Sequence, residues 1–192
     1  MEGEAKYSNK IFTIPNLLSF FRLLLIPVMW VLYVEWHEPL WTIAVVVLSG
    51  LTDVVDGKIA RKFHMTSNLG KILDPIADKL TQLALLAILL VQHEELVYVL
   101  ALQILKEIGM VISGLVVIKK TRVINGAIWP GKVCTVILYA TLLLLFLVPE
   151  MPAGAVWTLA LLCMVAIVGS FLLYMRHYRN LIRGLKQDEE GA

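Results

Sequence analysis

Charged residues are scarce in this chain. Asp, Glu, Lys and Arg together make up 17% of its 192 residues, whereas apolar residues make up 59%, and the mean hydropathy is +0.79. An ordinary soluble domain has about 25% charged and about 45–50% apolar residues. The composition therefore excludes an ordinary soluble domain and predicts an integral membrane protein.

Cysteine is also rare, and so is any excess of positive charge. The two cysteines, Cys134 and Cys163, both lie in apolar runs, which gives no zinc or disulfide pattern and predicts buried packing. The net charge of +2 leaves no basic surface of the size that nucleic acid requires. The polar N-terminal stretch has no small-residue cleavage site after the first apolar run, so we expect no cleaved signal peptide.

Apolar runs divide the sequence into spans of membrane length. The fold class we predict is all-α, with six transmembrane helices forming one membrane domain over residues 1–192. The runs fall at 19–35, 40–60, 72–92, 96–118, 127–148 and 153–175.

The connections between these runs alternate in charge. Residues 36–39, 92–96 and 148–152 contain no Lys or Arg, whereas the segments at the two ends and the second and fourth connections are basic. The positive-inside rule then predicts that both termini are cytoplasmic. The segment KIFTIPNLLSFFR (10–22) also mixes apolar and polar residues, and we expect an N-terminal amphipathic interfacial helix there, broken from the first span by Pro15.

Four aspartates lie near the expected cytoplasmic side, where carboxylates are rare unless they face water, a cation or a metal. Asp53 and Asp56 are three residues apart, and Asp74 and Asp78 are four apart, so each pair shares one face of a helix. The short connection between the second and third runs makes these helices antiparallel neighbours. All four carboxylates are therefore expected to converge.

Converging carboxylates repel one another unless cations neutralise them. Oxygen donors favour Mg²⁺, Mn²⁺ or Ca²⁺ over zinc, and a pair of such ions is a common clamp for phosphoryl transfer. Two other interpretations remain open at this point, a cation path and an ion-pair network with nearby basic residues. That network would use Lys58, Arg61, Lys71 and Lys79.

The spacing of these residues resembles a family signature. Asp53-x2-Asp56-Gly57-x2-Ala60-Arg61-x8-Gly70-x3-Asp74-x3-Asp78 resembles the complete motif of the CDP-alcohol phosphotransferases, and IPNLLSFFRLLLIPV is similar to the usual opening of that family. The resemblance implies transfer of a phosphate-bearing group from a CDP-activated donor to an alcohol, with release of CMP. It also implies that two Mg²⁺ or Mn²⁺ ions are held by Asp53, Asp56, Asp74 and Asp78.

The resemblance assigns further roles. Asp78 would also be the base that accepts the proton of the acceptor hydroxyl. The residues expected to contact or admit the CDP moiety are Thr52, Gly57, Ala60, Arg61 and Gly70. The implied donor is CDP-diacylglycerol, the implied assembly is a homodimer, and the implied location is a bacterial plasma membrane with the active site facing the cytoplasm.

The acceptor is indicated by two further stretches. LGKILDPIADKL resembles phosphatidylglycerophosphate synthases and single-motif cardiolipin synthases, and Lys106-Glu107 and Gly131-Lys132 line up with the members that use glycerol phosphate. Those members usually carry Arg where Lys106 stands, a second Arg near Val116, and Lys where Cys134 stands. We expect Lys106 and Lys132 to bind the acceptor and glycerol 3-phosphate to be that acceptor. Phosphatidylglycerol, serine, inositol and glycerol are the alternatives, and Lys106 and Glu107 could instead neutralise the aspartates and each other.

Two other function classes use the same acidic residues. A cation transporter would need a path across the membrane, but the four acids lie at one side of it, and Gly57, Ala60 and Arg61 have no purpose in such a path. A non-catalytic interaction protein would not need a complete set of metal ligands. The sequence therefore favours an enzyme of phospholipid synthesis.

Overall fold

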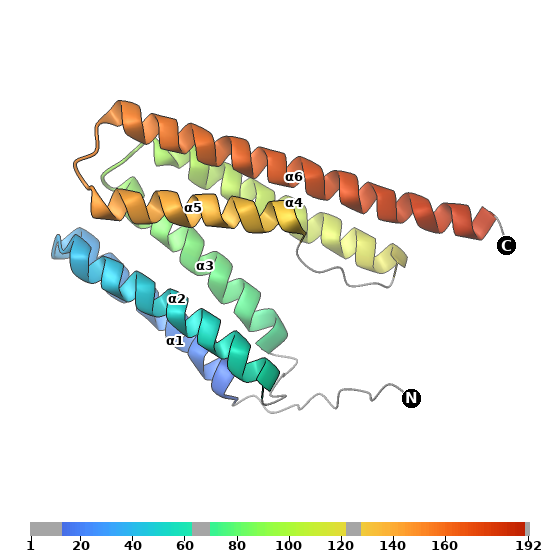
Figure 1. Ribbon diagram of the computed structural model, residues 1–192, viewed down its shortest axis with the longest axis horizontal. Helices are drawn as coiled ribbons and strands as arrows, with labels where there is room; N and C mark the ends of the chain where they lie inside the picture. The colour runs from blue at the N-terminus through green and yellow to red at the C-terminus, as the bar shows by residue number, and fades with distance from the viewer. Residues whose placement is uncertain (1–12, 63–69, 122–127, 191–192) are drawn as a thin grey trace. The chain divides into compact units, whose positions relative to one another are not determined.

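The computed structural model describes residues 13–62, 70–121 and 128–190 (Figure 1). Near the ends of several helices, including residues 56–62 and 184–190, it describes the backbone alone. The described residues form helices joined by short turns, with no strand among them. The helices are α1 (Ile14–Trp30), a π-helical segment (Val31–Glu35), α2 (Pro39–Lys62), α3 (Gly70–Leu90), α4 (Leu96–Thr121), α5 (Trp129–Leu147) and α6 (Ala153–Glu190).

Each predicted apolar run overlaps one α-helix, and the first run also includes the π-helical segment, which confirms the all-helical class and is consistent with a membrane protein. Within the described residues, four helical stretches are long and apolar enough to cross a membrane, namely Asn16–Glu35, Leu96–Lys119, Trp129–Leu147 and Ala153–Arg183. In α2 the apolar part is shorter, Pro39–Thr52, and ends where the acidic motif begins. Asp74, Asp78 and Lys79 likewise interrupt the apolar character of α3. The motif charges therefore explain why these two helices differ from the other four.

The expected break at Pro15 is wrong. Residues 14–30 form one continuous helix, and Pro15 lies in its first turn. Proline is tolerated there because the first amide groups of a helix have no carbonyl partner within it, and its fixed φ suits the helix. Thr13 caps the same turn by accepting a hydrogen bond from the Asn16 amide at 3.4 Å. Within residues 13–22 there is thus no separate interfacial helix, and residues 10–12 of that expectation lie outside the described part.

The first helix ends in a wider turn. Pro27 lies inside α1 and cannot donate a backbone hydrogen bond, and the π-helical segment begins four residues later. The Trp36 amide donates to the Val31 carbonyl at 3.0 Å, five residues back. His37 then takes a φ of 56°, a left-handed conformation that reverses the chain before α2 begins at Pro39.

Contacts group the chain into two compact units, Met1–Val91 and Gln92–Ala192. In the first unit α1 packs against both α2 and α3. One buried stripe runs along α1 and the π-helical segment, and its residues change from polar to apolar along the way. Asn16, Ser19 and Arg22 make up its polar half, whereas Leu25, Met29 and Tyr33 continue it as apolar residues.

In the second unit α6 packs against both α4 and α5. Tyr174 of α6 lies against Gly131 of α5, where an added Cβ atom would come within 2.6 Å of the tyrosine oxygen. That oxygen also accepts a hydrogen bond from the Ile128 amide at 3.0 Å. Further along, the Cys163 thiol lies 3.3 Å from the Thr141 hydroxyl, and both cysteines are buried and free, which confirms their predicted packing role.

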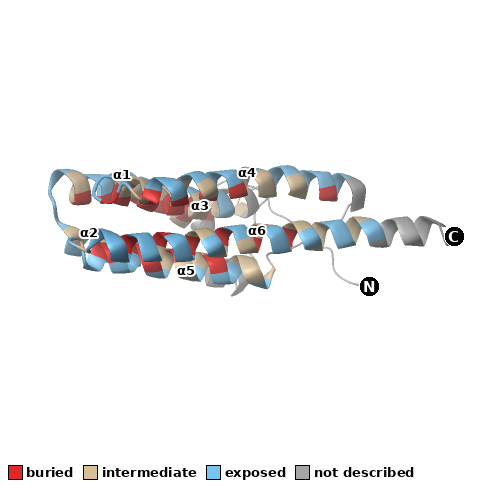
Figure 2. Cartoon of the chain, turned by 90° about the horizontal axis from the view of Figure 1, so that it is seen from above, coloured by how far each residue is buried: buried red, intermediate tan, exposed pale blue. Residues whose placement is uncertain are grey.

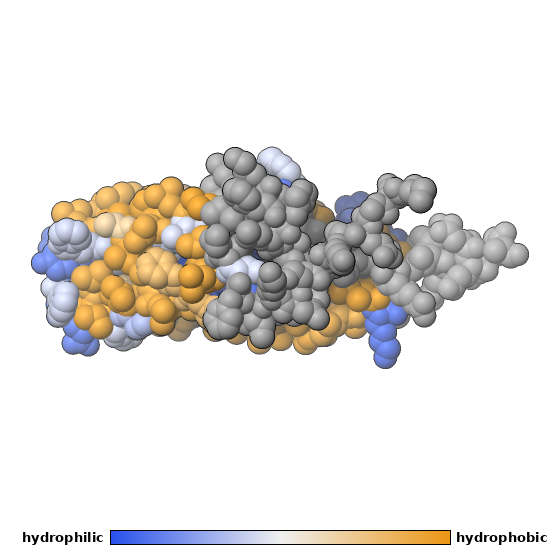
Figure 3. Space-filling view, turned by 90° about the horizontal axis from the view of Figure 1, so that it is seen from below, coloured by the Kyte–Doolittle hydropathy of each residue, from blue (hydrophilic) through white to orange (hydrophobic). Residues whose placement is uncertain are grey.

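Burial follows stripes on the helices, and the remaining surface is apolar. Figure 2 shows buried residues in rows along α4 and α6, with exposed residues on the other faces of the same helices. Only 17% of the most apolar part of α4 is buried, so most of its large apolar side chains face outwards. In Figure 3, hydrophobic residues cover most of the coloured part of the face shown. A surface of this kind requires a lipid environment.

Candidate active site

The acidic motif is divided between two helices of the first unit. Asp53 and Asp56 lie in the second half of α2, and Asp74 and Asp78 lie in the first half of α3. The connection 63–69 lies outside the described residues. The backbone positions of the α2 aspartates are described but their side chains are not, and the same holds for the predicted donor residues Gly57, Ala60 and Arg61.

Asp74 lies against the polar half of the buried stripe on α1. The Ser19 hydroxyl donates to Asp74 Oδ1 at 3.5 Å, and Arg22 Nη1 lies 3.7 Å from the same oxygen. The Arg22 side chain is 2% exposed, whereas that of Asp74 is 47% exposed. The guanidinium therefore supports the carboxylate from the protein interior, while the carboxylate itself remains accessible.

Arg22 and Ser19 are site residues that sequence reasoning missed. In the sequence, Arg22 is one of the basic residues near the N-terminus that indicate topology, yet it is buried and paired with a motif aspartate. A signal was present, because Asn16, Ser19 and Arg22 recur every three residues along an otherwise apolar helix. Polar residues with that spacing share one helical face, which indicates a buried polar contact.

Asp78 lies one turn beyond Asp74 on α3. Its side chain is 33% exposed, and Lys79 Nζ lies 3.8 Å from Asp78 Oδ2. Two carboxylates four residues apart face the same side of a helix. Pro75, between them, cannot donate to the carbonyl one turn earlier, which loosens the backbone hydrogen bonding of α3 beside the motif.

Two of the predicted donor-binding residues are described with their surroundings. Thr52 precedes Asp53 on α2, and its hydroxyl donates to the Ser49 carbonyl at 2.7 Å. Gly70 is the first residue of α3 and is partly exposed. The hydroxyl hydrogen of Thr52 is thus engaged within α2, while its oxygen retains the capacity to accept a hydrogen bond.

The predicted acceptor residues lie on separate helices of the second unit. Lys106 is buried on α4, and its Nζ lies 3.0 Å from Glu107 Oε1. Gln103 donates to the same carboxylate oxygen at 3.1 Å. Lys132 lies in the first turns of α5 and is exposed. Both helices pack against α6, and no described contact joins the two lysines.

The donor set of the motif fits a divalent metal. Asp74 and Asp78 offer oxygen atoms from accessible carboxylates, and none of the fixed positions of the motif is a cysteine or a histidine. Oxygen-only sets suit Mg²⁺ and Mn²⁺. Among the side chains that the structure describes, no group of three or more His, Cys, Asp or Glu residues comes together, because only two of the four motif carboxylates belong to that part.

Most of this chain, including the acidic motif, matches a known protein family. The family model described as CDP-alcohol phosphatidyltransferase matches residues 12–173. A protein of Aquifex aeolicus named CDP-diacylglycerol–glycerol-3-phosphate 3-phosphatidyltransferase is 35% identical over 133 residues, covering 68% of this chain and 73% of the relative.

Other relatives match over a shorter region. A putative cardiolipin synthase of Mycobacterium tuberculosis is 44% identical over 72 residues, which cover 38% of this chain. A cardiolipin synthase (CMP-forming) of Streptomyces coelicolor is 42% identical over 78 residues, also 38% of this chain. The chain spans only 34% and 36% of the lengths of these two relatives.

Proposed function

The chain belongs to the CDP-alcohol phosphatidyltransferase family, and we propose that it transfers a phosphatidyl group from CDP-diacylglycerol to an alcohol, releasing CMP. The observation that carries this proposal is the complete motif of residues 53–78, which lies on α2 and α3 inside the matched region. The support of Asp74 by α1 adds a structural reason for the first helix to belong to the same site.

Asp53, Asp56, Asp74 and Asp78 are the proposed ligands of two Mg²⁺ or Mn²⁺ ions. Bound metal would stabilise the negative charge that develops on the departing CMP. Arg22 and Ser19 hold Asp74 from behind through one carboxylate oxygen, Oδ1. The α1 residues thus reduce the number of orientations that the Asp74 carboxylate can adopt, which favours a fixed ligand geometry.

Asp78 is the proposed base. The acceptor hydroxyl loses its proton to the Asp78 carboxylate as its oxygen attacks the phosphorus that bears diacylglycerol. The bond from that phosphorus to the oxygen of the CMP group breaks, and CMP leaves with the bonding electrons. The partial exposure of Asp78 is consistent with access by an acceptor from water. Proposed donor contacts are Thr52, Gly57, Ala60, Arg61 and Gly70.

Glycerol 3-phosphate is the proposed acceptor. The Aquifex relative, most of which this chain covers, is named for that acceptor. Lys132 is exposed near the start of α5 and carries a charge that suits a phosphate. Lys106 is already paired with Glu107, so it would meet the acceptor as part of a polar group with Glu107 and Gln103. Phosphatidylglycerol is the second candidate, because the mycobacterial and streptomycete relatives are named cardiolipin synthases.

The same proposal includes the membrane arrangement. The six helices would each cross the bilayer, as one catalytic domain over residues 1–192, with both termini and the motif at the cytoplasmic side. The charge alternation of the connections supports this orientation. The location proposed is a bacterial plasma membrane, and the assembly proposed is a homodimer.

The test uses purified protein with CDP-diacylglycerol, Mg²⁺ and one acceptor at a time. The acceptors are glycerol 3-phosphate, phosphatidylglycerol, serine, inositol and glycerol. CMP and the lipid product are measured by mass spectrometry, with Asp53→Asn as the inactive control. We expect CMP and phosphatidylglycerophosphate with glycerol 3-phosphate. If only another alcohol supports turnover, that alcohol is the acceptor in place of glycerol 3-phosphate. If none of them gives CMP, the proposed reaction class is wrong.

A further inference from the structure

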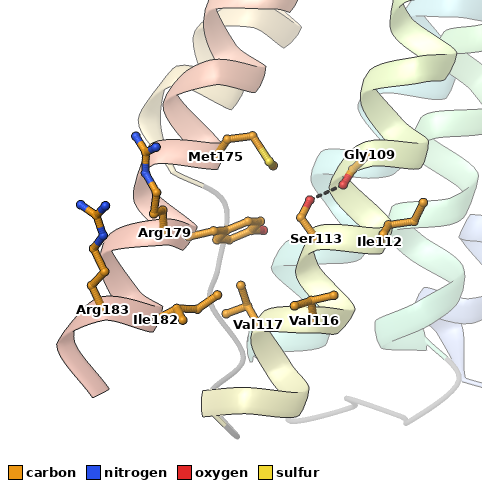
Figure 4. A pocket seen from close by; sticks show the side chains of 10 residues that line it. Gly109, Ile112, Ser113, Val116, Val117, Met175, Arg179, Ile182 and Arg183 are labelled. Atoms are coloured by element: carbon orange, nitrogen blue, oxygen red, sulfur yellow. Dashed lines mark hydrogen bonds between the residues drawn. The ribbon is translucent and has the colours of Figure 1, made fainter. Parts of the chain in front are cut away.

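A cavity of about 550 Å³ lies between α4 and α6 in the second unit (Figure 4). Its size is within the range of about 300–1,000 Å³ that ligand pockets occupy. We call it the α4–α6 groove, and its lining residues are Gly109, Ile112, Ser113, Val116, Val117, Met175, Tyr178, Arg179, Ile182 and Arg183. None of these residues belongs to the acidic motif or to the predicted acceptor set.

The groove lies beside a tight contact between the two helices. An added Cβ atom at Gly109 would come within 2.8 Å of the Phe171 ring, so α4 and α6 already touch at that level. Small residues allow this close approach of helices in membranes. The hollow is therefore a feature of packed helices rather than a gap between helices that do not meet.

The walls of the groove are mainly apolar. Ile112, Val116 and Val117 come from α4, while Met175 and Ile182 face them from α6 (Figure 4). The Ser113 hydroxyl donates to the Gly109 carbonyl within α4, so its hydrogen is not directed at a ligand. A hydrocarbon chain matches such walls, whereas a small hydrated anion does not.

Two arginines stand at the edge of this apolar surface. Arg179 and Arg183 are exposed, one turn apart on α6, and their guanidinium groups extend in the same direction, outward from α6 and away from α4 (Figure 4). Among the side chains that the structure describes, which do not include those of residues 184–190, no carboxylate lies within ion-pair distance of either of them. Paired guanidinium groups bind phosphate oxygens well, and basic pockets between transmembrane helices bind the head groups of anionic lipids.

We propose that the α4–α6 groove binds one anionic phospholipid of the bilayer, with an acyl chain along the apolar walls and the phosphate at Arg179 and Arg183. The apolar walls select a lipid over a soluble phosphate. The two cations, without a described carboxylate beside them, select an anionic head group over a zwitterionic one, whose ammonium group they would repel. This lipid is a ligand in addition to the substrates of the proposed reaction.

The test measures lipid binding by native mass spectrometry of the purified protein, with dioleoyl phosphatidic acid as the probe because it is neither the proposed donor nor a proposed acceptor. We expect tighter retention of phosphatidic acid than of dioleoyl phosphatidylcholine. The double variant Arg179→Gln, Arg183→Gln should bind phosphatidic acid about tenfold more weakly, the scale of a lost charge-assisted contact. Arg176→Gln is the matched control, since Arg176 is exposed on the same helix but does not line the groove.

A second variant tests the apolar part. Val116→Trp should fill the groove and weaken phosphatidic acid binding while both arginines remain; Val116 is exposed, so the fold tolerates the larger side chain. Three results would overturn the proposal: equal losses in the double variant and in Arg176→Gln, displacement of phosphatidic acid by inorganic phosphate at equal concentration, or one-for-one displacement by CDP-diacylglycerol. The last result would assign the groove to the donor instead.

Discussion

At the scale of single residues, the contact between Arg22 and Asp74 joins two segments that are far apart in the sequence. Ser19 and Asp74 are 55 positions apart, yet the hydroxyl of one reaches the carboxylate of the other. The motif spacing predicts where Asp74 lies on α3. It does not predict which residue supports Asp74 from behind, because that depends on how α1 packs against α3. In the sequence, only the three-residue repeat of Asn16, Ser19 and Arg22 indicates a buried polar contact on α1.

The first prediction concerns the proposed base. Asp78→Asn should lower CMP release by at least about a hundredfold, since an amide cannot take the acceptor proton and general bases contribute about 10²–10⁴-fold. Binding of CDP-diacylglycerol should fall much less, because the base acts on the acceptor. Single-turnover CMP release and equilibrium donor binding separate the two effects. Glu94→Gln, the same chemical change at an exposed turn residue, is the control; near-normal turnover in Asp78→Asn would exclude this residue as the base.

The second prediction distinguishes two roles of Asp74, its structural contact with Arg22 and its part in the reaction. Asp74→Ala should lower the melting temperature by a few degrees, since the buried Arg22 guanidinium loses its contact with the Asp74 carboxylate. Adding Arg22→Met to that variant should recover much of this loss, because the buried charge is removed with its partner. Neither variant should release CMP. Thermal unfolding in detergent, with CMP assays alongside, checks both statements. Recovery of turnover in the double variant would show that Asp74 has only a structural role.

At the scale of helices, the sequence predicted the elements well and their ends less well. Apolar runs bounded by polar turns identify each helix, because a membrane span leaves little choice of structure. The N-terminal boundary failed for a local reason, since a proline after a polar stretch can separate two helices or begin one. The π-helical segment at Val31–Glu35 has no pattern in the sequence beyond the proline that precedes it.

The third prediction concerns helix packing in the second unit. Gly131→Ala should destabilise the protein, since the new methyl group overlaps the Tyr174 ring, whose oxygen is fixed by the Ile128 amide. Gly169→Ala is the matched control, because nothing lies within 4 Å of a Cβ atom there. That control should be neutral or stabilising by up to about 1 kcal/mol, the helix preference of Ala over Gly. The measurement is the melting temperature of both variants and of the wild type in one detergent. Equal shifts in the two variants would contradict the packing of Tyr174 against Gly131.

The fourth prediction concerns the turn that precedes α4. Burial lowers the pKa of His93 below its ordinary value of 6.5, and the nearby Glu95 carboxylate opposes this shift. The unfolded chain therefore binds more protons than the folded one between the ordinary pKa and the lowered one. The part of the folding stability that depends on neutral His93 is therefore fully present above about pH 6.5. It is lost as the pH falls from there through the lowered pKa of the folded protein.

Melting temperatures across that range test the pH prediction. The wild-type melting temperature should fall between about pH 7.5 and about pH 5.5, and His93→Gln should flatten this fall. His37→Gln, at an exposed histidine, is the control and should keep the wild-type slope. An unchanged slope in His93→Gln would assign the pH dependence to other groups.

At the scale of the whole molecule, the acidic motif is distinctive because the helices that carry it have shorter or interrupted apolar stretches. The Asp pairs shorten the apolar part of α2 and interrupt that of α3, while the other four helices keep full spans. Charges in such positions are expensive in a bilayer and are retained for function. The sequence could predict which helices carry the motif, but the contact of Asp74 with α1 required the folded first unit, and the α4–α6 groove required the folded second unit.

The fifth prediction addresses the central claim, that the acidic residues of α2 and α3 act with a divalent metal on CDP-diacylglycerol. The measurement is the rate of CMP release by purified wild-type protein with CDP-diacylglycerol and glycerol 3-phosphate, in Mg²⁺, in excess chelator, and after Mg²⁺ is restored. We expect release in Mg²⁺, none in chelator, and recovery on restoration, with no release by Asp74→Asn in any condition. Full release in excess chelator, or by Asp74→Asn, would contradict the account.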